Sequence, residues 1–165
     1  MTDQGHDIPS GQRIDRAFFN RALYPETDTV RPRFQDLDPL NHINNTAMAA
    51  MFEDARVRFN YPMRKLFRHN GARTLIGGIV SNYIAEAHMN PEIVFHMGIG
   101  RIGRTSWTLQ TVAWQGDHPV YYGLATMVMT RDGRPMPMPE RLRDMLEARR
   151  LTPPGLVPAH APDRE

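Results

Sequence analysis

The residues best suited to chemistry lie close together in the segment 34–45, which reads FQDLDPLNHINN. It contains two carboxylates, one imidazole and the amides of two consecutive asparagines: Asp36, Asp38, His42, Asn44 and Asn45. Carboxylates and imidazoles act as general acids, general bases or nucleophiles in enzymes. Because Pro39 disfavours helix at the residue before it, Asp38 is expected in an extended turn. The pattern therefore predicts a reactive site in a turn, with Asp38 as the candidate catalytic group.

This turn leads into a predicted helix that begins with Asn44 or Asn45 as its N-cap and runs to about Phe59. Its apolar residues recur every three or four positions, as on one buried face: Met48, Met51, Phe52, Ala55 and Phe59. The first amides of a helix have no partners within the helix, so they can hold the oxyanion that develops on an attacked carbonyl. A carboxylate beside such amides has the parts needed for acyl chemistry.

Other interpretations of the turn stay open. Asp38 and Asn41 could serve only to build it, with His42 a surface residue and an asparagine only the helix cap. The spacing of Asp36, Asp38 and His42 is also compatible with a metal site, although we predict none. A phosphatase that uses an Asp-x-Asp motif would continue with a crossover helix and parallel strands, which the later sequence does not offer.

The segment Gly98–Gly103, GIGRIG, matches the dinucleotide-binding fingerprint GxGxxG letter for letter. That fingerprint requires a following helix and an acidic residue about 20 positions further on. Here residues 104–114, RTSWTLQTVAW, predict a strand instead. We therefore interpret the glycines as a turn and expect no nucleotide cofactor.

Turn residues and periodicity define the remaining elements. A short strand is expected over Thr29–Phe34, and Pro62 is expected to begin a second, shorter helix that Gly71 closes. Between residues 74 and 129, stretches rich in Ile, Val, Thr, Tyr and Trp predict four consecutive strands joined as hairpins. The breaks between these strands are expected at Asn90-Pro91, Gly98–Gly103 and Gly116-Asp117.

Segment 107–114 alternates with the two-residue period of a strand, one face carrying Trp107, Leu109, Thr111 and Ala113. A last helix is expected over residues 139–150, with one apolar side formed by Leu142, Met145 and Leu146. One long apolar helix and an antiparallel sheet of about five strands can bury each other if the sheet wraps around the helix. We therefore predict an α+β protein with the hotdog fold.

Composition narrows the other possibilities. The chain has 165 residues, of which 41% are hydrophobic, and this suits one domain over residues 13–150 between a disordered leader at 1–12 and a disordered Pro-rich tail at 151–165. It has no cysteine, so thiol nucleophiles and thiolate metal sites are excluded. The net charge of +2 without a dense basic stripe argues against nucleic-acid binding. Without an apolar export signal or membrane span, a soluble cytoplasmic protein is expected.

Several motifs of this chain have a known counterpart. They are VRPRFQDLD at 30–38, HINN at 42–45, MFEDAR at 51–56, RIGRTS at 101–106 and GRPMPMP at 133–139. With these motifs, residues 29–146 resemble the 4-hydroxybenzoyl-CoA thioesterase-like family of hotdog acyl-CoA thioesterases. The resemblance implies an enzyme that hydrolyses an acyl-CoA thioester to the free acid and coenzyme A without a cofactor.

The resemblance also implies roles for individual residues. Asp38 would be the nucleophile or general base, an amide N–H near Asn45 would polarise the thioester carbonyl, and His42 would be a second proton-transfer group. The residues expected to bind substrate are Asn44, Met48, Phe52, Arg101, Arg104 and Ser106. Met48 and Phe52 would line an acyl tunnel. The two arginines and the serine would meet the coenzyme A phosphates across the seam of a homodimer or homotetramer.

Some hotdog thioesterases use a glutamate on the central helix, where Glu53 is the candidate. Its spacing to Arg56 instead predicts a surface ion pair, as does that of Asp54 to Arg58. Two other functions stay open. A hotdog hydratase or dehydratase is one, since segment 36–42 is similar to the Asp-x-Asn-Pro-x-His motif but has Asp for Asn and one extra residue before the His. The other is a non-catalytic binder of acyl-CoA.

Overall fold

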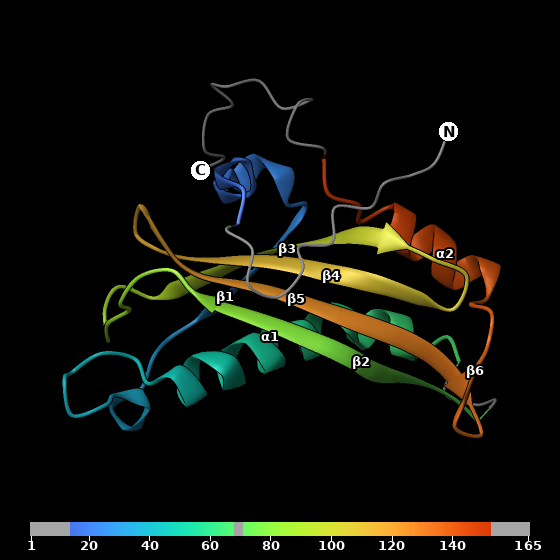
Figure 1. Cartoon of the computed structure of the whole chain (residues 1–165), viewed down its shortest axis with the longest axis horizontal. Helices are drawn as coiled ribbons and strands as arrows, with labels where there is room; N and C mark the ends of the chain where they lie inside the picture. Colours follow the sequence, from blue (N-terminus) through green and yellow to red (C-terminus); the bar gives the residue numbers. More distant parts are fainter. Residues whose placement is uncertain (1–13, 68–70, 153–165) are drawn as a thin grey trace.

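An antiparallel sheet curls around one long helix in the computed structural model, which describes residues 14–67 and 71–152 (Figure 1). The sheet has the strand order β1-β3-β4-β5-β2, with β6 attached to β5. The strands are β1 Glu26–Val30, β2 Ala72–Tyr83, β3 Ile93–Ile102, β4 Ser106–Gln115, β5 His118–Arg131 and β6 Arg134–Pro135. The helices are α1 Asn45–Arg64 and α2 Glu140–Glu147, with short 3-10 helices η1 Arg16–Phe19, η2 Arg21–Leu23 and η3 Phe34–Asp36. The predicted α+β hotdog arrangement is confirmed.

Both faces of the sheet are covered at β4, which is therefore buried along almost its whole length. Trp107, Leu109 and Ala113 belong to the main core with the apolar face of α1. Val112 points the other way and packs in a smaller cluster with Phe18 of η1. Figure 1 shows α1 on one side of the sheet and the N-terminal 3-10 helices, in blue, on the other. The predicted alternation of this strand is confirmed: one face of β4 packs against the main core and the other against the smaller cluster.

Helix α1 begins where the Asn44 side chain accepts a hydrogen bond from the N–H of Thr46 at 2.8 Å, so the predicted asparagine cap is confirmed. The helix does not end near Phe59 but continues through Pro62. Pro62 has no N–H and removes one helical hydrogen bond. The buried side chains of Phe59 and Met63 nevertheless continue the apolar face on both sides of it. The predicted second helix is therefore wrong, because its first residues form the last turn of α1.

The strand connections also differ from the predicted run of hairpins. The pairs β3–β4 and β4–β5 are hairpins, but β2 pairs antiparallel with β5, from Ala72 opposite Arg131 to Tyr83 opposite Tyr121. Strand β3 already has β1 and β4 as its two neighbours, so it has no side left for β2. As a result β2 forms an edge of the sheet, and the chain crosses the sheet to begin β3.

Two boundaries move for local reasons. The strand expected at 29–34 is β1, which ends at Val30 because Pro32 cannot donate to a strand ladder. In the glycine segment, only Gly103 lies in the turn, whereas Gly98 and Gly100 lie inside β3. A Cβ on Gly100 would lie 2.8 Å from the hydroxyl of Thr108, so a close approach of β4 explains this glycine. The element that follows is a strand, as predicted.

The predicted leader at residues 1–12 and most of the predicted tail at 151–165 lie outside the described residues. The last helix is confirmed as α2, with Leu142 and Leu146 fully buried in the main core and Met145 packed against it. Among the described residues, no helix is both long enough and apolar enough to cross a membrane.

Candidate active site

Asp38 lies in a tight turn between η3 and α1. Its Oδ1 accepts hydrogen bonds from the backbone N–H groups of Leu40 and His42, at 2.9 and 3.0 Å. Its own N–H donates to the carbonyl of His42 at 2.8 Å, and Asn41 adopts a left-handed φ of 64°, which asparagine tolerates. Asp38 and Asn41 thus do build the turn. Within residues 14–67 and 71–152, however, the second carboxylate oxygen of Asp38 has no hydrogen-bond partner.

Asp36 anchors the same turn. Its carboxylate accepts hydrogen bonds from the backbone N–H of Arg33 at 2.7 Å and from the guanidinium at 3.1 Å, and its carbonyl accepts from the N–H of Asn44 at 2.8 Å. Burial alone would raise the pKa of Asp36, but the side-chain and backbone hydrogen bonds and the charge of Arg33 outweigh burial and lower it. Asp36 is therefore an ionised structural anchor for the turn that presents Asp38.

A cavity of about 210 Å³ opens beside this turn at the N-terminus of α1. Four of the predicted site residues line it: Asp38, His42, Asn45 and Met48. The lining is completed by Ile43, Tyr83, Ile84, Ala85, Glu86, Ala87 and Val120. The structure thus brings the three predicted catalytic residues into one cavity, together with the first residue of the predicted acyl tunnel.

The first turn of α1 contributes Asn45 and Met48 to this cavity. Asn44 does not line it, because its side chain caps the helix by accepting from Thr46. The hydroxyl of Tyr83 donates to the carbonyl of Asn45 at 3.1 Å, which ties the end of β2 to the start of the helix. Within the described part of the chain, the N–H of Asn45 has no partner. It is therefore an amide that can donate to a substrate oxygen.

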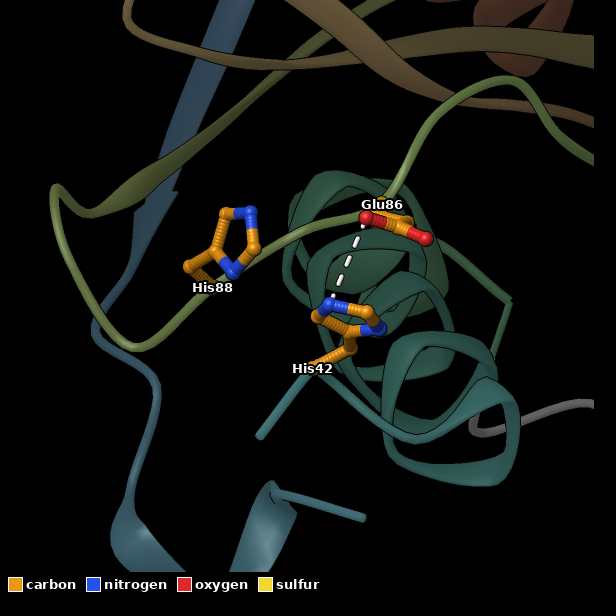
Figure 2. Close-up of side chains that lie close together, drawn as sticks. All are labelled: His42, Glu86 and His88. Atoms are coloured by element: carbon orange, nitrogen blue, oxygen red, sulfur yellow. Dashed lines mark ion pairs between the residues drawn. The ribbon is translucent and has the colours of Figure 1, made fainter. Parts of the chain in front are cut away.

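His42 forms a cluster with two residues that were not predicted from the sequence as site residues. Its Nε2 lies 3.3 Å from Oε2 of Glu86, and its ring meets the ring of His88 edge to face at a centroid distance of 5.1 Å. Figure 2 shows the three side chains close together, with Glu86 and His88 on the segment that follows β2. The motif Glu-Ala-His places both on one side of an extended segment. That signal was present in the sequence, but only the folded chain shows that this side faces His42.

The other predicted substrate-binding residues do not reach the cavity. Phe52 is buried between helix and sheet, where its ring would lie 2.9 Å from a Cβ on Gly123, so it acts as a core residue. The last three predicted residues lie at or just beyond the end of β3: Arg101, Arg104 and Ser106. Residues 86–88, which are close to the cavity, precede the start of this ten-residue strand, so the two groups are roughly 30 Å apart.

Both carboxylates of α1 pair with the predicted arginines, but Arg56 is buried and does not lie on the surface as expected. Glu53 lies 3.2 Å from Nη2 of Arg56, and Asp54 lies 2.5 Å from Nη1 of Arg58. Arg58 also contacts Asp28 of β1 at 2.8 Å and so links helix and sheet. Glu53 is not among the residues that line the cavity beside Asp38.

A larger hollow of about 660 Å³ lies at the other end of α1, where β2 begins. Its cations are Arg64, Lys65 and Arg73, and none of its described lining residues is a carboxylate or a histidine. Its described lining therefore offers neither of the side chains that most often act as general bases. The candidate active site is therefore the smaller cavity at Asp38.

Solved structures share this fold. A protein from Pseudomonas aeruginosa strain PAO1 is 22% identical with a TM-score of 0.70, covering 80% of this chain and 96% of that one. A predicted thioesterase from Bacillus stearothermophilus is 27% identical with a TM-score of 0.67, covering 77% and 97%. A thioesterase from Thermus thermophilus, solved with coenzyme A and Zn, is 26% identical with a TM-score of 0.67, covering 76% and 95%.

Comparison with curated proteins finds no significant match. The family model of the thioesterase-like superfamily, in contrast, matches residues 32–146. That span is more than half of the chain and contains the turn at Asp38, helix α1 and strands β2 to β5. The chain therefore belongs to the thioesterase-like superfamily.

Proposed function

We propose that the protein is an acyl-CoA thioesterase, which hydrolyses an acyl-CoA thioester to the free acid and coenzyme A. The observation that carries this proposal is the cavity at the start of α1, which is lined by both Asp38 and Asn45. Membership of the thioesterase-like superfamily supports thioester hydrolysis. The similar Thermus thermophilus thioesterase, solved with coenzyme A, supports coenzyme A as the thiol.

Asp38 acts through its unengaged oxygen in one of two ways. As a general base it takes a proton from water, whose oxygen bonds to the carbonyl carbon; the C–S bond then breaks and the proton passes to the coenzyme A sulfur. As a nucleophile it bonds to the carbonyl carbon itself and expels the thiolate, and water hydrolyses the resulting anhydride. In both routes the amide N–H at Asn45 donates to the developing oxyanion.

His42 is proposed as the second proton-transfer group, because it lines the same cavity and is held by the carboxylate of Glu86. A carboxylate partner orients an imidazole, and an imidazole can pass a proton to the departing thiolate. Met48 is proposed to contact the acyl group, since it is the apolar side chain of α1 that reaches the cavity.

A second copy of the chain is proposed to complete the site, as a homodimer or a dimer of dimers. The cavity of about 210 Å³ is smaller than the roughly 300–1,000 Å³ of ordinary small-molecule sites. The edge strand β2 exposes large apolar side chains, Leu75, Ile76, Ile79 and Tyr83. Such an edge favours pairing with another strand. The proposed contact of Arg101, Arg104 and Ser106 with coenzyme A phosphates requires this partner, given their distance within one chain.

The test is free thiol release from a panel of short, long, branched and aromatic acyl-CoA esters. Asp38→Asn is expected to reduce turnover by about 10²- to 10⁴-fold, the usual contribution of a catalytic base. Asp132→Asn is the matched control, because Asp132 is an exposed turn residue with a φ of 51° that asparagine also tolerates. Circular dichroism of both variants verifies that they fold.

Turnover that survives in Asp38→Asn would overturn the assignment of Asp38. An absence of thiol release from every ester by the wild type would overturn hydrolysis itself. Enoyl-CoA hydration and calorimetric binding of acyl-CoA would then separate a hydratase from a non-catalytic binder.

A further inference from the structure

We propose that His42, Glu86 and His88 form a binding site for a divalent transition-metal ion of the Zn²⁺ class. One ligand atom from each side chain lies within 4.8 Å of the other two. The proposed hydrolysis gives no role to His88 and uses Glu86 only to orient His42. A metal site accounts for the convergence of all three, and it does not depend on whether the chain hydrolyses thioesters.

Backbone hydrogen bonds hold the segments that carry these residues. The N–H of Ile43 donates to the carbonyl of Ala87 at 2.7 Å, so the residue after His42 is fixed to the residue between Glu86 and His88. Residues two apart in an extended segment point to the same side, and Figure 2 shows both on the side of His42. The arrangement is therefore set by the backbone before any ion binds, which lowers the entropic cost of binding.

The buried side chain of Gln115 provides a second anchor from β4. Its Oε1 accepts from the backbone N–H of His88 at 2.7 Å, and its Nε2 donates to the backbone carbonyl of His88 at 2.7 Å. Both bonds use the backbone of His88 and leave its exposed imidazole to turn toward the other two ligands. The site thus combines a fixed backbone with side chains that can adjust.

The donor set matches the chemistry of zinc, which binds imidazole nitrogen and carboxylate oxygen. Zn–N and Zn–O bonds of about 2.0–2.2 Å place tetrahedral ligands roughly 3.4 Å apart. His42 Nε2 and Glu86 Oε2 are already 3.3 Å apart. The largest separation in the set is no more than 4.8 Å, and rotation of the exposed Glu86 and His88 side chains can close it. Imidazoles also favour transition metals over Mg²⁺ or Ca²⁺.

Three protein ligands leave one tetrahedral position open, as in zinc sites that bind water or a substrate. His42 and Glu86 both line the cavity that contains Asp38, so this position lies next to the proposed site of hydrolysis. The carboxylates of Glu86 and Asp38 make the region attractive to a cation. A bound ion would take the nitrogen of His42 out of proton transfer and leave Asp38 as the base.

The test is calorimetric titration of Zn²⁺ into the full chain, purified without a polyhistidine tag, treated with a chelator and studied without thioester. One ion is expected to bind per chain. Glu86→Gln and His88→Ala are each expected to weaken binding by at least about tenfold, because even outer-shell changes have effects of 10- to 100-fold. His118→Ala is the matched control, since His118 is an exposed histidine at the start of β5, and it is expected to bind like the wild type. Circular dichroism verifies the fold of each variant.

If the wild-type protein shows no saturable binding of Zn²⁺, the proposal is overturned. Binding that is unchanged in both Glu86→Gln and His88→Ala would also overturn it, because the ion would then occupy another site. The titration contains no substrate and is independent of thiol release. A chain that binds zinc but releases no thiol would support the metal site and contradict the proposed hydrolysis. A chain that releases thiol but binds no zinc would support the hydrolysis and contradict the metal site.

Discussion

Asp38 has an observed structural task and a proposed chemical task, and a single substitution must separate them. One carboxylate oxygen closes the turn by accepting two backbone N–H groups. The other oxygen is proposed to attack the carbonyl or to take a proton. Asp38→Ala would remove both, so its loss of activity would have two explanations. Asparagine keeps an oxygen acceptor for the turn and removes the basic carboxylate. Asp38→Asn therefore isolates the chemical task from the structural one.

Asp36→Asn is expected to destabilise the fold at neutral pH and to make its stability less sensitive to acid. The folded-state pKa of Asp36 is lowered, because hydrogen bonds and charge from Arg33 outweigh the opposing effect of burial. Such a group stabilises the fold fully above its unfolded-state pKa of about 3.9 and loses this contribution as the pH falls through the lower folded-state value. Urea denaturation of both proteins across an acid pH series should show a difference that narrows below about pH 4. A difference that stays constant would contradict this role.

Single residues could be predicted where the contacts are local. Two features depend only on neighbours within a few positions: the turn at Asp38 and Asn41, and the asparagine cap. Both can therefore be predicted from the types of the residues that form them. Glu86 and His88 are far along the chain from His42, and only the hydrogen bond between the segments brings them together. No spacing rule in the sequence describes such a contact. The catalytic roles of Asp38, His42 and Asn45 stay predictions.

At the scale of elements, the first turn of α1 determines how its amides are presented. Asn44→Ala is expected to lower the free energy of unfolding by about 1 kcal/mol, because it removes the cap on the N–H of Thr46. Asn45→Ala is the matched control, since it keeps the cap and changes an exposed neighbouring residue. Urea denaturation of the two variants compares them directly. Equal losses would show that the cap does not stabilise the helix.

Elements with a strong repeat could be predicted, and their pairing could not. Strand β4 alternates clearly because Trp107 and Val112 face different covers. The pairing of β2 with β5 is decided by contacts between strands that β3 and β4 separate in the chain, and turn signals carry no such information. The prediction that Pro62 begins a second helix was wrong for a related reason. The burial of Met63 in the core outweighs the hydrogen bond lost at the proline.

At the scale of the whole molecule, the two edges of the sheet differ in kind. Strand β1 is five residues long and mostly polar, and Asp28 and Glu26 pair with arginines at 2.8 and 3.0 Å. Strand β2 has 12 residues and exposes Leu75 and Ile79. Charges protect an edge from pairing, whereas a long apolar edge invites it. The β2 edge is therefore where a second copy is expected.

Ile79→Lys is expected to shift the protein toward a monomer, because a lysine on the edge opposes strand pairing. Light scattering after gel filtration should then give a mass near the 18.9 kDa of one chain, below that of the wild type. Thr27→Lys, an exposed position on the opposite edge, is the matched control and is expected to keep the wild-type mass. Equal masses for the wild type and Ile79→Lys would contradict the proposed interface.

The cavity at Asp38 also bears on how the chain folds. Its walls come from residues 38–48, from 83–87 and from Val120, so no continuous piece of the chain can build it. Strand β2 pairs with β5 although β3 and β4 lie between them in the chain. Bringing together strands so far apart in the chain closes a long loop, which is slower than forming a local hairpin. During refolding, this cavity is therefore expected to form only when β2 closes the sheet, after the β3-β4-β5 meander has formed.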